Sequence, residues 1–119
     1  MKIVEVPIKD LNNGNNQQRG FLEQLDEGKS PFHTDYYRRL KDYRRRTGSR
    51  QEVWSNEKLH EYMLERVALY EDVKENGIKH PLRVRRADNR IVDGNHRAEI
   101  WRHLGHDKIK VYYVDWEVK

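Results

Sequence analysis

The sequence contains no cysteine, and among its 119 residues it has only three prolines and two phenylalanines. Without cysteine the chain can form no disulfide, no thiolate zinc site and no cysteine nucleophile. No apolar run approaches the roughly 18 residues that a membrane-spanning helix needs, and the first residues do not resemble a signal peptide. We therefore expect a cytoplasmic protein that has no membrane partner.

Aliphatic residues and phenylalanine are also sparse, and they are unevenly distributed. Residues 1–8 hold four Leu, Ile, Val or Phe, residues 9–58 hold seven, and residues 59–119 hold sixteen. Charged residues make up 37% of the chain. The length predicts a single domain. We expect its core in residues 1–19 and 59–119, with a charged helical insertion at about 20–58.

Apolar periodicity predicts an α+β fold, a small mixed sheet with helices. Alternating patterns predict strands at residues 1–8, 81–85, 91–93 and 108–114. A helix is predicted over about 56–76, because its apolar residues recur on one face, and Gly77 and Pro81 mark its end. A second helix is predicted after residue 94, closing at Gly105.

The segment Asp93-Gly94-Asn95-His96-Arg97 lies between a predicted strand and a predicted helix. Glycine permits a sharp turn and close approach of an anion, and the N-terminus of a helix favours phosphate. His96 and Arg97 add donors, and an arginine can grip two phosphate oxygens. Asp93 is a candidate Mg²⁺ ligand and, with His96, a candidate acid–base pair. The local pattern alone supports phosphate binding and a plain capped turn equally.

A second feature is the basic segment at residues 38–50, which has a net charge of +6. Its basic residues are Arg38, Arg39, Lys41, Arg44, Arg45, Arg46 and Arg50. Such density, interleaved with tyrosines, favours binding to a nucleic-acid backbone without specifying a base sequence. The alternatives are a solvated helical face and neutralisation by the acidic residues of helix 56–76.

The two ends of the chain resemble the ParB/sulfiredoxin superfamily. The resembling features are a helix ending in Asn76-Gly77-Ile78, a strand opening with Pro81-Leu82, and Gly94-x-x-Arg97 opening a helix that closes in Leu104-Gly105. Residues 1–19 are similar to the opening strand of the family, and Gln17-Gln18-Arg19 resembles its Gln-Pro-Arg element. Residues 20–58 match nothing in the family.

The resemblance implies a fold that binds a nucleoside triphosphate, ATP or CTP, together with Mg²⁺. By position, it implies that Gly94, Asn95, His96 and Arg97 hold phosphate and that Arg19 reaches it from the opening loop. Members of the superfamily include CTP-switched DNA-partition clamps, ATP-dependent sulfinic acid reductases, a free-serine kinase and nucleases.

The departures from the family narrow these options. Sulfiredoxin chemistry needs a cysteine where Asn95 stands, so that chemistry is excluded. The kinase branch is similar at Asp-Gly-x-His-Arg, but its catalytic glutamate is missing from residues 12–16. Partition clamps carry a downstream helix-turn-helix and a dimerisation domain, which these residues do not include. We therefore expect a stand-alone small member of the superfamily.

Three hypotheses follow from the sequence. The first is a DNA-associated ParB-like domain that binds nucleotide or nucleic-acid phosphates at residues 93–97, with Mg²⁺-dependent hydrolysis or nuclease activity through Asp93 and His96. The second is an ATP-dependent small-molecule kinase of the same fold. The third is a non-catalytic adaptor for a protein partner or a second copy of the chain. Trp101 is expected in the core.

Overall fold

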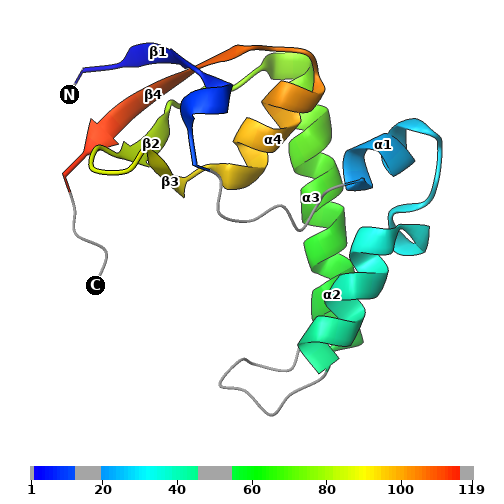
Figure 1. Cartoon of the computed structure of the whole chain (residues 1–119). Coiled ribbons are helices and arrows are strands. Elements are labelled where there is room, and N and C mark those ends of the chain that lie inside the picture. The colour runs from blue at the N-terminus through cyan, green and yellow to red at the C-terminus, as the bar shows by residue number, and fades with distance from the viewer. Residues whose placement is uncertain (1, 13–19, 46–54, 116–119) are drawn as a thin grey trace. The chain divides into compact units, whose positions relative to one another are not determined.

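The computed structural model describes residues 2–12, 20–45 and 55–115. The chain divides into two compact units, shown together in Figure 1. The first unit comprises residues 1–16 and 72–119, and the second comprises residues 17–71. The boundary falls within a long helix, whereas the sequence placed the end of an insertion near residue 58. That the chain forms one domain stays a prediction.

The first unit is built on a four-stranded mixed sheet in the order β1-β4-β2-β3. Its elements are β1 (Val4–Pro7), β2 (Leu82–Arg85), β3 (Arg90–Asp93), α4 (Asn95–His103) and β4 (Lys108–Val114). Strand β4 runs antiparallel to β1 and parallel to β2, and β2 and β3 form an antiparallel pair. The α+β class expected from the sequence is confirmed.

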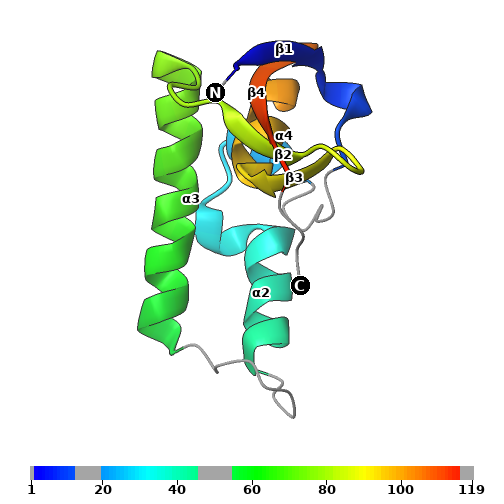
Figure 2. The same cartoon turned by 90° about the vertical axis from the view of Figure 1, so that its left-hand side faces the viewer.

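One face of this sheet carries the core of the first unit. On β4, Ile109 and Val111 are buried while Lys108 and Lys110 are exposed, which is the alternation of a strand with one covered face. Helix α4 packs against the covered face through Ala98 and lies behind the strands in Figure 2. The sheet and α4 together therefore position the turn that joins β3 to α4.

The second unit has a small core of its own, contributed by α1 (Phe21–Asp26), α2 (Asp35–Arg45) and the part of α3 that lies within it. The rings of Phe21 and Tyr36 lie 5.0 Å apart between centroids, and both side chains are buried. Pro31 opens a 3₁₀ turn (Pro31–His33) between α1 and α2, where its ring prevents a continuous helix.

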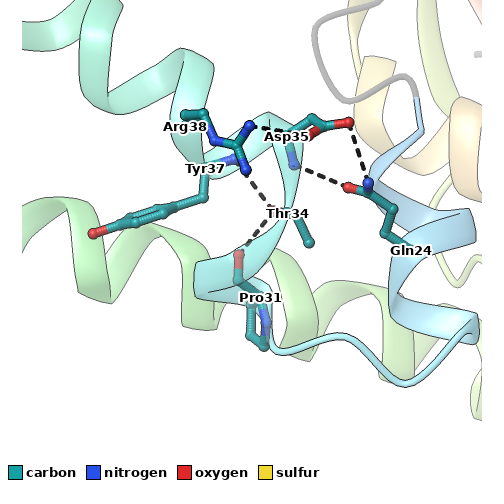
Figure 3. A network of polar contacts seen from close by, with 6 residues as sticks. All are labelled: Gln24, Pro31, Thr34, Asp35, Tyr37 and Arg38. Atoms are coloured by element: carbon teal, nitrogen blue, oxygen red, sulfur yellow. Dashed lines mark hydrogen bonds and ion pairs between the residues drawn. The ribbon is translucent and has the colours of Figure 1, made fainter.

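Thr34 caps the start of α2 (Figure 3). Its Oγ1 accepts a hydrogen bond from the Tyr37 N–H at 3.2 Å and donates one to the Pro31 carbonyl at 2.8 Å. The Asp35 N–H donates to Gln24 Oε1 at 2.9 Å, and Gln24 Nε2 donates to Asp35 Oδ2 at 3.2 Å. These bonds satisfy N–H groups that the first turn of a helix leaves without partners, and they tie α2 to α1.

Helix α3 (Asn56–Asn76) has the apolar face that the sequence predicts. The residues on that face are Leu59, Met63, Tyr70 and Val73, all buried, and Val67, which is half-buried. Gly77 follows the helix with a φ of 73°, and its N–H donates to the Val73 carbonyl at 2.9 Å. Among the described residues, no helix is apolar over a length that would cross a membrane.

Candidate functional site

The turn between β3 and α4 is built around Gly94. This residue has φ 106° and ψ 22°, in the left-handed region, and no side chain caps the helix that follows. A Cβ atom at this position would lie 2.8 Å from Leu82 Cγ and 3.1 Å from Arg97 Nη2. Since Leu82 is fully buried in β2, it cannot easily withdraw. Both the backbone conformation and the available space therefore require glycine here.

Two arginines converge on the carboxylate of Asp93 beside this turn. Arg83 Nη2 and Arg97 Nη2 each lie 3.4 Å from Asp93 Oδ2. Arg83 stands opposite Asp93 in the register of β2 and β3, and Arg97 lies one helical turn beyond Asp93. Arg97 Nη1 also donates to the His80 carbonyl at 3.3 Å. The turn thus brings two guanidinium groups to one carboxylate oxygen.

Asn95 and His96 occupy the first turn of α4, and both are half-buried. The Asn95 Oδ1 atom is buried and has no hydrogen-bond donor within the part of the chain that the structure describes. A buried amide oxygen normally has a partner, so this atom is an acceptor open to a water molecule or a ligand.

The structure therefore brings five of the residues singled out by sequence to one turn, namely Asp93, Gly94, Asn95, His96 and Arg97. Arg19, the fifth expected phosphate ligand, lies outside the described residues. Across residues 2–12, 20–45 and 55–115, no group of three or more His, Cys, Asp or Glu side chains is placed to hold a metal ion. That Asp93 holds a Mg²⁺ ion stays a prediction.

Sequence reasoning missed Arg83 and His80, which both contact the turn. The signal for Arg83 lay in the alternation of β2, where the neighbours Leu82 and Val84 face the core and Arg83 must face the other side. Its pairing with Asp93 required the hairpin register, which contains an irregularity between Arg83 and Val84. The role of His80 had no sequence signal, because its backbone carbonyl makes the contact.

The basic segment is only partly described. Arg38, Arg39 and Lys41 are exposed on α2, whereas Tyr36 and Leu40 on the same helix are buried. Arg38 Nη1 lies 3.8 Å from Asp35 Oδ1 (Figure 3). For the rest of the segment, the side chains of Arg44 and Arg45, and Arg46 and Arg50 as a whole, lie outside the described residues.

Trp101 agrees only in part with the expected core position. It packs against the core cluster but is half-buried. Its indole stacks on the His106 ring, with centroids 3.6 Å apart and an angle of 7° between the planes. The indole N–H donates to the Lys108 carbonyl at 2.9 Å. The helical spacing identified the correct side of α4, but the indole reaches past the core to the loop before β4.

Of three comparisons with known proteins, two found no match. No protein-family model matches the chain, and no curated protein matches its sequence. One solved structure, the C2221 form of a Pnob8-like ParB-N domain, is similar over 98% of this chain, with 17% sequence identity and a TM-score of 0.49. The chain spans 30% of the length of that protein chain.

The elements that carry the sequence resemblance occur in the structure where the resemblance places them. Helix α3 ends before Gly77, β2 begins at Leu82, and α4 begins after Gly94. These elements confirm the α+β fold expected from the sequence, while ligands and activity stay predictions.

Proposed function

We propose that the turn between β3 and α4 binds the phosphate groups of a nucleotide or a nucleic acid. The observation that carries this proposal is the sharing of one carboxylate, Asp93, by two guanidinium groups, Arg83 and Arg97, directly beside Gly94. A bound phosphate would pair with the guanidinium of Arg97, whose Nη1 contacts a backbone carbonyl and not a carboxylate.

Arg97 is the residue best placed to contact the phosphate. Its guanidinium has five N–H donors, and its two contacts, to Asp93 and the His80 carbonyl, are long at 3.4 and 3.3 Å. Weak contacts of this kind orient the group while leaving donors for an anion. A neighbouring helix N-terminus adds a partial positive charge and unsatisfied N–H groups, and Gly94 lets an anion approach the backbone.

Asn95 favours a ligand larger than phosphate alone. Its buried Oδ1 is an acceptor, so it would repel a phosphate oxygen but accept from a hydroxyl or an amino group. Nucleotides carry sugar hydroxyls close to their phosphates, and several carry an amino group on the base. This buried acceptor therefore supports a nucleotide over inorganic phosphate as the ligand.

The contacts of Asp93 favour a positioning role for it over a role as a general base. Its Oδ2 faces two guanidinium groups, which stabilise the ionised carboxylate and hold it as an anchor for the arginines. Mg²⁺ commonly takes one or two protein carboxylates and completes its shell with phosphate oxygens and water. Asp93 could hold such an ion once phosphate is present. Hydrolysis, cleavage and kinase activity would in addition require a base, for which His96 is the candidate.

Calorimetric titration of the chain with ATP, CTP and GTP, each with Mg²⁺, tests the proposal. We expect one nucleotide to bind, and Arg97→Ala to weaken it by about 10- to 100-fold, since a hydrogen bond to a charged group contributes about 1.5–3 kcal/mol. Arg102→Ala is the matched control, because Arg102 is exposed in the last turn of the same helix. No binding, or equal affinities in the two variants, would refute the proposal.

The exposed cations of α2 support nucleic acid as a further partner. Arg38, Arg39 and Lys41 face solvent on a helix that buries Tyr36 and Leu40. Replacing Arg44, Arg45 and Arg46 together by Gln should weaken binding to single-stranded DNA. It should also reduce the slope of log K against log salt by about 0.7 for each phosphate that the segment no longer neutralises. An unchanged slope would show that this segment does not bind the DNA.

A further inference from the structure

A concave site in the first unit is lined by residues other than those of the Gly94 turn. It is a cavity of about 440 Å³, bordered by the segment 77–81, which leads into β2, by Trp101 of α4, and by the strands β1 and β4. Its volume falls within the range of about 300–1,000 Å³ that is typical of small-molecule sites. None of the five residues of the Gly94 turn lines it.

The buried part of the cavity lining is apolar. Ile109 is buried, and Ile78 and Trp101 are half-buried. The indole of Trp101 is held in place by its stacking on His106 and by the hydrogen bond from its N–H to the Lys108 carbonyl. A flat aromatic surface that is already fixed loses little conformational entropy when a ligand packs on it.

The exposed part of the lining carries an excess of positive charge, from three lysines against one glutamate. Lys79, Lys108 and Lys110 are exposed, and within the described residues none of them has a hydrogen-bond or ion-pair partner for its ammonium group. Glu5 also lines the cavity and stands opposite Lys110 in the register of β1 and β4, yet these two described side chains form no ion pair with each other.

Three arginines of the β2–β3 hairpin behave differently. Arg83, Arg85 and Arg86 each have a carboxylate within 4 Å, provided by Asp93, Asp88 and Asp115 respectively. The lysines around the cavity therefore present positive charge directly above an apolar lining. Such a pairing of surfaces complements a ligand that is apolar in its body and negative at one end.

We propose that this cavity binds a small organic anion with a flat apolar body, of the class of aryl carboxylates and aryl sulfonates. The ring system packs on Trp101, and the anionic group faces Lys108 and Lys110. This site is independent of the phosphate site, because it shares no lining residue with the Gly94 turn.

The test uses 8-anilinonaphthalene-1-sulfonate as the anionic probe and N-phenyl-1-naphthylamine as its uncharged analogue. We expect saturable one-to-one binding of the sulfonate, with a shift of the Trp101 indole N–H signal in the NMR spectrum. The double variant Lys108→Gln/Lys110→Gln should weaken that binding at least fivefold and leave the neutral analogue unaffected. Raised ionic strength should weaken the binding of the sulfonate and leave the binding of the uncharged analogue unchanged.

Two control variants distinguish binding in the cavity from a general effect of charge and from binding at the Gly94 turn. Lys9→Gln/Arg90→Gln removes the same charge from positions of the first unit that do not line the cavity, and it should retain the affinity of the parent. Arg97→Ala should also retain the parent's affinity for the sulfonate, whether or not this variant binds nucleotide. Equal losses in the two double variants, non-saturable binding, or an unmoved Trp101 signal would each overturn the proposal.

Discussion

Replacement of Gly94 by alanine probes the turn on which the candidate site depends. The new methyl carbon would stand 2.8 Å from Leu82 Cγ, 3.3 Å from Leu82 Cδ2 and 3.1 Å from Arg97 Nη2. Arg97 can move its flexible end, but Leu82 is fully buried in the core. The substitution therefore strains the backbone and also overpacks the core next to β2.

Two contributions set the size of the effect. An alanine in the left-handed region costs roughly 1–2 kcal/mol relative to glycine. An extra methyl group pressed into a packed core costs roughly 1–3 kcal/mol more. The expected loss in free energy of unfolding is thus roughly 2–5 kcal/mol, a large part of the roughly 5–15 kcal/mol that stabilises an ordinary domain.

Gly105→Ala is the matched control for this measurement. Gly105 follows the same helix, α4, and has a φ of 96°, but a Cβ atom there would have no other atom within 4 Å. The loss in free energy of unfolding of Gly105→Ala should therefore come from backbone strain alone. Urea unfolding followed by circular dichroism measures both variants, and Gly94→Ala should be less stable than Gly105→Ala by about 1–3 kcal/mol. Equal stabilities would refute the close packing of the turn against Leu82.

Three further predictions concern other parts of the chain. The hydrogen bond from Arg85 lowers the pKa of Asp88 from 3.8 to about 2, so its stabilising effect should be present above pH 4 and lost as the pH falls toward 2. An NMR titration of Asp88 with an ordinary midpoint would contradict this. Burial and the hydrogen bond to Asp26 raise the pKa of Tyr70 above 10, so the native state should lose stability as the pH rises above 10. Tyr70→Phe should remove the part of this stability loss that comes from Tyr70. A dependence of stability on alkaline pH that is identical in the variant and the parent would contradict the prediction. Thr34→Ala should destabilise the fold by about 1 kcal/mol through loss of the α2 cap, while Thr34→Ser should not; equal unfolding midpoints for these two variants would exclude the cap.

The ends of the elements around the site could be predicted because glycine and proline act locally. Gly77 and Pro81 stop α3, and Gly94 separates β3 from α4, each through backbone geometry that depends on a few neighbouring residues. Alternation likewise identified the strands near the site, since side chains on successive residues of a strand face opposite ways.

The partners of the site residues could not be predicted, because they depend on pairing between distant segments. Arg83 reaches Asp93 only through the hairpin register, and Arg97 reaches the His80 carbonyl across 17 positions of sequence. The half-buried place of Trp101 similarly depends on His106 and Lys108, which approach it after the helix has ended. Periodicity alone carries no information about such contacts.

The most direct test of phosphate binding at the turn is an NMR titration of the ¹⁵N-labelled chain with inorganic triphosphate. We expect the largest shifts on the amide signals of Asn95, His96 and Arg97 and on the guanidinium signal of Arg97. Arg97→Ala should reduce the shifts of the remaining amide signals. Shifts confined to other segments, with the signals of residues 94–97 unmoved, would contradict it.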